Sequence, residues 1–175
     1  MIYSRVLVVL FLTFFIYGNV LAEKIVSTGN YSYSLTLNTT ADKQTIWELW
    51  YDVENWKSYD TVLKYSYLEE GSDFAVGSFG YVKARGAPKT KFELVEVDLG
   101  NGFVENLKLP LWSSLDLKRR VVRLDNKTVA FTHEVEFKGR FKRVMYWLLA
   151  KRFKKDLKMV MTNMKTIAES EKLSK

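Results

Sequence analysis

The sequence predicts an α+β fold in which a curved antiparallel sheet of six to seven strands wraps around a long C-terminal helix. Two aromatic-rich segments with helical spacing, residues 40–56 and 140–171, stand at opposite ends of a strand-rich chain. Alternating apolar and polar runs lie between them, and turn residues separate these runs at short intervals. Short connections join antiparallel neighbours, and a sheet wrapped around one helix has room for a ligand between the two layers.

An amino-terminal signal peptide is predicted over residues 1–22. Arg5 is the only charge in this stretch, an apolar run follows it, and Val20 and Ala22 fit the small-residue pattern before a cleavage site. Cleavage after Ala22 leaves residues 23–175 as one exported domain, periplasmic or secreted. The alternative is that the apolar run stays uncleaved as a membrane anchor, because it approaches the roughly 17–25 residues that a spanning helix needs.

The composition excludes several kinds of chemistry. The 175 residues contain no cysteine and one histidine, so disulfides, thiol nucleophiles, thiolate metal sites and histidine-rich metal sites are excluded. No metal and no cofactor is therefore expected. The formal net charge of +7 would attract any polyanion, but an exported protein rarely meets nucleic acid, and no nucleic-acid partner is expected. The aromatic content of 15% is enough to fill a core and to line a pocket.

The first strand and the first helix follow each other directly. Residues 25–37 alternate between apolar and polar side chains, which is the period of a β-strand. Residues 41–53 place Ile46, Leu49 and Trp50 at spacings of three and four, which predicts an amphipathic helix. Six further strands are predicted at residues 62–68, 78–84, 91–98, 103–108, 113–124 and 128–138.

The last of these strands indicates which residues face the interior. Phe131, His133 and Val135 share one face, whereas Glu134 and Glu136 share the other. This alternation predicts that the apolar face lies under the C-terminal helix and the acidic face lies in water. The only histidine of the chain therefore points inward among aromatic residues, where burial lowers its pKa and keeps it neutral.

Three interpretations of His133 stay open. It is a core histidine bonded to a backbone group or a hydroxyl, a polar contact in a ligand cavity, or a catalytic base. Arg119 and Arg120 present a related question, because neighbouring strand residues must send one guanidinium to each face of the sheet. Alternation alone does not say which of the two enters the interior.

The C-terminal helix, residues 140–171, has an apolar stripe that predicts packing on the sheet and a basic face on the opposite side. The basic face includes Lys151, Arg152 and Lys155, and Trp147 lies one turn before them. Such a face is either an ordinary solvated surface or a surface that docks on anionic membrane lipid, with Trp147 as an anchor at the membrane interface.

Several short motifs resemble the START-like helix-grip superfamily, also called SRPBCC, in its polyketide cyclase/dehydrase and lipid-transport branch. The likeness covers roughly residues 26–170. The motifs are Ile46-Trp47-Glu48-Leu49, Asp52-Val53-Glu54-Asn55-Trp56 with Tyr59, Val76-Gly77-Ser78, residues 132–139 and Asn163-Met164-Lys165. The resemblance implies a helix-grip fold with a ligand cavity between sheet and helix. Because the superfamily hosts binders, transporters and enzymes, it constrains the architecture more than the chemistry.

Two functions from different classes follow. The first is a non-enzymatic carrier or binder of a hydrophobic small molecule or lipid. The second is an enzyme similar to polyketide cyclases and dehydrases, with His133 as the base in the same cavity. The sequence shows no second acid–base pair to accompany this histidine, which favours the carrier and leaves no catalytic residue assigned. The residues predicted to line the cavity are Trp56, Tyr59, Phe79, Tyr81, Phe131, His133 and Val135.

Overall fold

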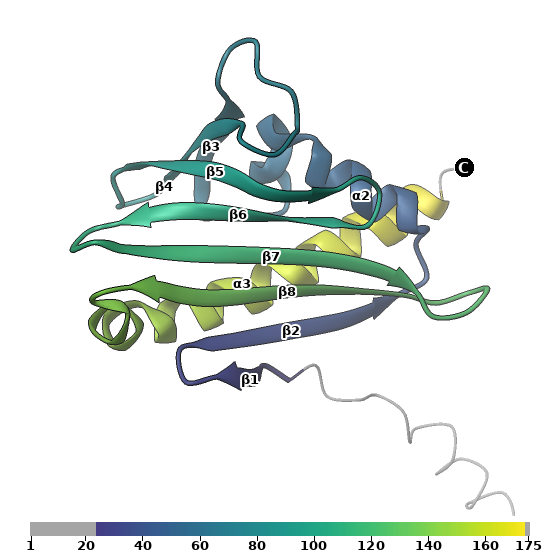
Figure 1. The fold of residues 1–175 in the computed structure, drawn as a ribbon. Helices are drawn as coiled ribbons and strands as arrows, with labels where there is room; N and C mark the ends of the chain where they lie inside the picture. The colour runs from purple at the N-terminus through teal and green to yellow at the C-terminus, as the bar shows by residue number, and fades with distance from the viewer. Residues whose placement is uncertain (1–23, 174–175) are drawn as a thin grey trace, which may run out of the picture.

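The computed structural model describes residues 24–173 and has the α+β architecture that the sequence predicts (Figure 1). Within these residues, eight strands form one antiparallel sheet in the order β1-β2-β8-β7-β6-β5-β4-β3. The strands are β1 (Val26–Gly29), β2 (Ser32–Thr39), β3 (Leu63–Leu68), β4 (Phe79–Ala84), β5 (Lys89–Asp98), β6 (Gly102–Leu109), β7 (Ser113–Arg123) and β8 (Val129–Gly139). The helices are α2 (Lys43–Tyr51), the 3₁₀ helix η1 (Val53–Ser58) and α3 (Lys142–Leu173).

The described residues contain one strand more than the upper prediction of seven, because the first predicted strand, residues 25–37, is a hairpin. A turn at Asn30 separates β1 from β2, and Ser27 lies opposite Tyr33. Asparagine after glycine is favoured in such turns, a feature hidden within an otherwise alternating run. β2 continues beside β8, so the chain's first long strand pairs with its last.

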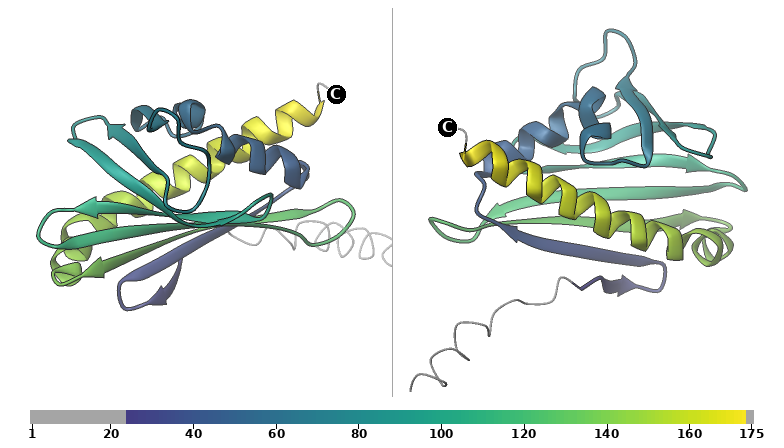
Figure 2. Two further views of the ribbon diagram at one scale, coloured as in Figure 1. Left: turned by 45° about the horizontal axis from the view of Figure 1, so that its top comes forward. Right: turned by 180° about the vertical axis from the view of Figure 1, so that it is seen from behind.

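Helices α2, η1 and α3 lie on one face of the sheet (Figure 2). α3 packs across β2, β7 and β8 and also contacts α2. It begins at Lys142 and ends at Leu173, two residues later at each end than the predicted helix. Gly139 ends β8 with a φ of 89°, a left-handed conformation that glycine adopts without strain, and so turns the chain into the helix.

The core between sheet and helices is strongly aromatic. Trp50, Trp56, Phe92 and Phe103 are all buried. The ring of Trp56 stacks 5.7 Å from Phe92 and 6.2 Å from Phe103, and its Nε1–H donates a 2.8 Å hydrogen bond to the Trp50 carbonyl. The predicted helix over residues 41–53 therefore ends earlier, and the 3₁₀ turn that follows carries Trp56 into the interior.

The predicted signal peptide, residues 1–22, lies outside the described residues. Its cleavage after Ala22 stays a prediction, which N-terminal sequencing of the exported protein would test. Over residues 24–173 no helix combines the length and the apolar character needed to cross a bilayer.

Candidate functional site

A buried ion pair occupies the inner face of the sheet. Arg119 of β7 and Glu105 of β6 face the helices, with Arg119 Nη2 2.9 Å from Glu105 Oε1. Their side chains are 7% and 2% exposed. The guanidinium carbon lies 4.8 Å from the ring of Trp56 and 4.7 Å from the ring of Phe103. Burying two charges among aromatic rings costs several kcal/mol per ion in desolvation, so this pair is an unexpected feature in a core that apolar residues could fill.

Two further polar side chains lie beside the ion pair. His133 of β8 is directly opposite Arg119 in the β7–β8 register. Tyr59 follows η1 and is buried close enough for the charges of Arg119 and Glu105 to affect its pKa. The backbone carbonyl of Tyr59 accepts a 3.0 Å hydrogen bond from Asn163 Nδ2, which ties this loop to α3. We call Tyr59, Glu105, Arg119 and His133 the polar cluster.

Each member of the polar cluster has one buried side-chain atom without a hydrogen-bond partner among the described residues. These atoms are Tyr59 Oη, Glu105 Oε2, Arg119 Nη1 and His133 Nε2. A buried polar atom left unpaired costs about 1–3 kcal/mol, and native proteins contain few of them. Four such atoms on four neighbouring residues form a set of donors and acceptors that is available to a bound molecule.

Burial sets the protonation states of the cluster. It lowers the pKa of His133 well below its usual range, and the Arg119 charge acts in the same direction, so the imidazole is neutral. Burial also raises the pKa of Tyr59, which keeps the phenol protonated. Burial raises the pKa of Glu105, although its ion pair with Arg119 opposes the change. The cluster therefore offers a permanent cation, a phenolic O–H and a neutral imidazole.

The neutrality of His133 makes a measurable prediction. The unfolded chain protonates this histidine below about pH 6.5, whereas the folded chain does not, so the unfolded state binds more protons and folding stability falls as the pH falls. The slope reaches at most about 1.4 kcal/mol per pH unit. In urea unfolding between about pH 7.5 and pH 5, His133→Gln is expected to lose less stability than the wild type.

Two acids, the buried Glu105 and the half-buried Asp60, act in the opposite direction. Desolvation raises the pKa of both carboxyls, so the folded state binds their protons first and their contribution to stability rises as the pH falls. Because both acids are present in the wild type and in the variant, the difference between the two proteins isolates the histidine. Equal pH dependence in the two proteins would contradict a neutral, buried His133.

The structure brings most of the predicted cavity residues together. Trp56, Tyr59 and His133 surround Arg119, and Phe131 and Val135 share the inward face of β8 with His133. All five are buried. Their role in ligand binding stays a prediction.

Phe79 and Tyr81 do not lie with the others. In β4 the inward residue is Gly80, which pairs with Phe92, and a Cβ on Gly80 would come within 2.2 Å of the Phe92 ring. Phe79 and Tyr81 therefore occupy the opposite face, where Tyr81 donates a 2.9 Å hydrogen bond to Glu69. The placement of these two aromatic residues in the cavity was wrong, because the strand's small inward residue lets an aromatic ring from β5 fill that space.

Two members of the polar cluster were not identified from the sequence. From the sequence it stayed open whether Arg119 or Arg120 points inward. In the structure Arg119 is the inward residue, since it lies opposite His133 and pairs with the buried Glu105. Glu105 was not selected at all. The alternation of β6 would have indicated it. Phe103, Glu105 and Leu107 share one face of this strand, and Glu105 is the only charged residue between two apolar ones on that face.

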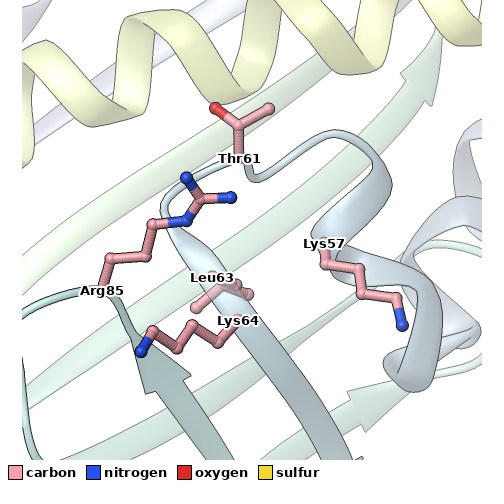
Figure 3. A pocket seen from close by; sticks show the side chains of 5 residues that line it. All are labelled: Lys57, Thr61, Leu63, Lys64 and Arg85. Carbon is pink, nitrogen blue, oxygen red and sulfur yellow. The ribbon is translucent and has the colours of Figure 1, made fainter.

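An open pocket lies where the loop after η1 meets α3 (Figure 3). Its volume is about 550 Å³. It is lined by Lys57, Thr61, Leu63, Lys64 and Arg85. None of the predicted cavity residues lines it, but the same loop carries Tyr59 into the polar cluster, and Thr61 reaches Met159 of α3 at 3.5 Å. It is therefore a basic surface pocket next to the loop that carries Tyr59.

The predicted docking residues lie on the outer surface of α3. Lys151, Arg152, Lys155 and Trp147 are all exposed. They lie away from the polar cluster, and Arg152 faces Asp156 one turn later at 3.6 Å. Membrane docking by this surface stays a prediction.

Comparisons with known proteins define the class of fold. Neither a family model nor a curated protein sequence matches this chain. Solved structures do match, and one is a START superfamily protein from Mycobacterium smegmatis. It has a TM-score of 0.63 and 10% sequence identity, over 79% of this chain and 97% of that one.

Two aromatase/cyclases are also similar in structure. One, from a Streptomyces species, has a TM-score of 0.57 and 14% identity over 76% of this chain and 92% of that chain. The other is the di-domain aromatase/cyclase of the steffimycin biosynthetic pathway, with a TM-score of 0.62 and 13% identity over 81% of this chain and 51% of that chain. The chain therefore has the START-like helix-grip fold, which confirms the predicted resemblance at the level of architecture.

Proposed function

We propose that this protein binds and carries a hydrophobic small molecule or lipid that bears one oxygen-containing polar group, such as a carboxylate or a ketone. The observation that supports this most directly is the set of four unpartnered polar atoms in the polar cluster, surrounded by aromatic rings. Ligand sites of this type are mostly apolar with a few convergent polar groups. The polar group would bind Arg119 and Tyr59, and the apolar part would pack on the rings around them.

Charge and hydrogen bonding favour an oxygen ligand. The free Nη1 of Arg119 and the Oη of Tyr59 are both able to donate a hydrogen bond. Bonds from a charged donor contribute about 1.5–3 kcal/mol, more than bonds between neutral groups. The loop that holds Tyr59 also borders the basic surface pocket lined by Lys57 and Arg85. An amphipathic anion would meet positive charge there before reaching the interior.

Replacing Tyr59 with phenylalanine is expected to weaken binding while leaving the fold intact. The variant removes a buried hydroxyl that has no partner, so the free energy of unfolding should stay equal or rise by about 1 kcal/mol. Binding of a dansyl-labelled undecanoic acid, followed by fluorescence, should weaken about tenfold, which corresponds to one lost hydrogen bond. Tyr65→Phe, at an exposed position, is the matched control and should change neither quantity.

Two results would count against this proposal. One is a Tyr59→Phe variant that binds the labelled acid as the wild type does. The other is a wild type that shows no preference between the labelled acid and a dansyl-labelled alkane of equal length. Native mass spectrometry of the purified wild type would identify a co-purified ligand directly.

A second function, proton abstraction next to a carbonyl, is favoured by one specific observation. His133 is neutral, and its Nε2 lies free beside the only buried arginine of the described residues. A neutral imidazole is able to accept a proton, and the guanidinium would stabilise the enolate that forms. The aromatase/cyclases noted above are similar only in fold, so this function rests on the residues themselves.

Deuterium exchange separates the two functions. An enzyme would incorporate deuterium from D₂O at the α-carbon of a hydrophobic methyl ketone, and His133→Gln would abolish this exchange while keeping the ketone bound. A carrier would bind the ketone without exchange in either protein. Nuclear magnetic resonance of the ketone measures both binding and exchange in one sample.

The location of this function is also proposed. An exported domain, periplasmic or secreted, follows from the signal peptide predicted over residues 1–22. Recovery of the uncleaved chain in a membrane fraction would favour the anchored alternative.

A further inference from the structure

Exposed aromatic and aliphatic side chains gather at the end of the sheet where β7 and α3 begin. Trp112, in the turn between β6 and β7, is 80% exposed, and Trp147 of α3 is 79% exposed. The ring of Trp112 lies 6.4 Å from that of Phe141, which immediately precedes the helix. We call this surface the tryptophan end. Its exposed members are Leu111, Trp112, Val144, Trp147 and Leu148, and it also includes the half-buried Phe141.

Helical spacing connects the two parts of this surface. Val144 and Leu148 lie four residues apart, on one side of the first turns of α3, and Phe141 precedes Val144 by three residues just before the helix begins. Trp147 is next to Leu148 in the chain. Large exposed apolar patches on soluble proteins mark interaction sites.

The backbone of the turn is strained in a way that keeps this surface exposed. Leu111 and Trp112 have φ values of 58° and 49°, and among the described residues they are the only non-glycine residues with positive φ. The conformation is held by a 3.1 Å hydrogen bond from the Arg140 backbone N–H to the Trp112 carbonyl. A Cβ on Gly139 would lie 2.3 Å from that carbonyl, so the close approach needs glycine. Such strain persists where the surrounding structure enforces it, and it clusters at functional sites.

The chain segment that contains most of the tryptophan end is basic, although Lys138 at its start pairs with Asp116 and Glu136. Residues 138–155 contain eight Lys and Arg residues and no Asp or Glu. Arg140, Lys142, Arg143 and Lys151 are exposed, and no salt bridge joins any of them to a carboxylate within residues 24–173. Exposed tryptophans near exposed cations fit the surface of an anionic bilayer, because tryptophan side chains prefer the membrane interface and Lys and Arg side chains are attracted to anionic headgroups.

We propose that the tryptophan end docks this protein on anionic membrane lipid, with Trp112 and Trp147 in the interface and the surrounding cations on the headgroups. The exposure of Leu111 and Trp112 was not predicted from the sequence, and it moves the docking surface toward the start of α3. Trp147 and Lys151 belong to it, whereas Arg152 and Lys155 lie further along the helix. None of these residues belongs to the polar cluster, so the docking proposal does not depend on the ligand.

A second copy of this chain is a poorer occupant. A two-fold dimer through this surface would place the same cations of both copies against each other, and like charges in contact are repulsive. An anionic bilayer instead attracts each Lys or Arg near its surface. This attraction should weaken as salt rises, because exposed charges are screened over about 10 Å at 0.1 M ionic strength.

Vesicle co-sedimentation of residues 23–175, which include the whole described fold, tests the proposal. The probes are phosphatidylcholine vesicles with and without about one-third phosphatidylglycerol, at about 0.05 M and 0.5 M salt. Binding is expected only with phosphatidylglycerol, and it should fall at least tenfold at the higher salt. Trp112→Ser with Trp147→Ser, and separately Arg140→Glu with Arg143→Glu, should each weaken binding at least tenfold. A blue shift of the tryptophan fluorescence should accompany binding by the wild type.

Matched controls remove exposed apolar side chains or positive charges at positions outside the tryptophan end. Val76→Ser with Leu99→Ser deletes two exposed apolar side chains, and Lys24→Glu with Lys127→Glu makes the same change in net charge. Both controls should bind vesicles within about twofold of the wild type. Circular dichroism and thermal unfolding confirm that each variant is folded before its binding is compared.

Several outcomes would overturn the proposal. They are equal binding to vesicles with and without phosphatidylglycerol, wild-type binding by folded tryptophan or arginine variants, or equal losses in the control variants. A concentration-dependent dimer that the tryptophan variant abolishes, without vesicle binding by the wild type, would assign the surface to a second copy instead. The labelled-acid assay on the same variants keeps the two proposals separate, because docking variants should bind the acid normally.

Discussion

Replacing Arg119 with methionine is expected to lower the free energy of unfolding by about 3–5 kcal/mol, because it leaves Glu105 buried without its cation. The two side chains are 7% and 2% exposed, so water cannot replace the lost partner. Urea unfolding at neutral pH measures the loss. The control is Arg120→Met at the next position, where the arginine lies on the outer face and pairs with Glu96 in solvent. That variant should cost less than about 1 kcal/mol.

Removing both charges separates stability from function. Arg119→Met with Glu105→Leu places apolar residues on both sides of the pair, and such replacements are often neutral or stabilising. We expect the double variant to recover most of the lost stability but not the binding of the labelled acid. A single Arg119→Met variant as stable as the wild type would show that Glu105 finds another partner. A double variant that still binds the acid would remove Arg119 from the ligand site.

Replacing Trp56 with alanine is expected to cost about 3–5 kcal/mol, the range for large-to-small changes at buried aromatic residues. The ring stacks on Phe92 and Phe103, supports the Arg119 guanidinium at 4.8 Å, and donates to the Trp50 carbonyl. The variant therefore leaves a cavity and one carbonyl without its donor. Chemical unfolding followed by circular dichroism measures the effect without depending on tryptophan fluorescence.

Trp147→Ala is the matched control for Trp56, since it removes the same side chain from a position that is 79% exposed. It should change stability by less than about 0.5 kcal/mol. A small effect at Trp56 would mean that the core collapses around the missing ring. Comparable effects at the two positions would contradict the burial that distinguishes them.

The sequence predicted the features that depend on local period. β8 has eleven residues in which apolar and polar side chains alternate, so only one face of this strand is apolar enough to be buried. The inward direction of Phe131, His133 and Val135 followed from this pattern. β4 has only six residues, and both of its faces contain apolar side chains. Its orientation depends on pairing with Phe92 of β5, which is tertiary information. For that reason the assignment failed for Phe79 and Tyr81.

The ion pair of the polar cluster and the exposure of the tryptophan end could not be found by period alone. Alternation within β6 is consistent with an inward Glu105, but only the contact with Arg119 of the neighbouring strand shows that the two charges form a buried pair. The exposure of Trp112 depends on a strained turn that Gly139 holds from a distant part of the chain. Sequence patterns describe one element at a time, whereas these features arise where two elements meet.

The pairing of β2 with β8 also affects how fast the protein folds. Thr36 and Thr132 face each other across these strands although 96 positions separate them in the chain. From β4 to β8, each strand pairs with the strand that precedes it in the chain, so the part of the sheet from β3 to β8 is able to form from local hairpins. The closing of the β2–β8 pair must instead enclose a long loop, and sheets with such distant partners fold in milliseconds to seconds. During synthesis, β2 is therefore able to pair with β1 early but lacks its second partner until β8 has emerged.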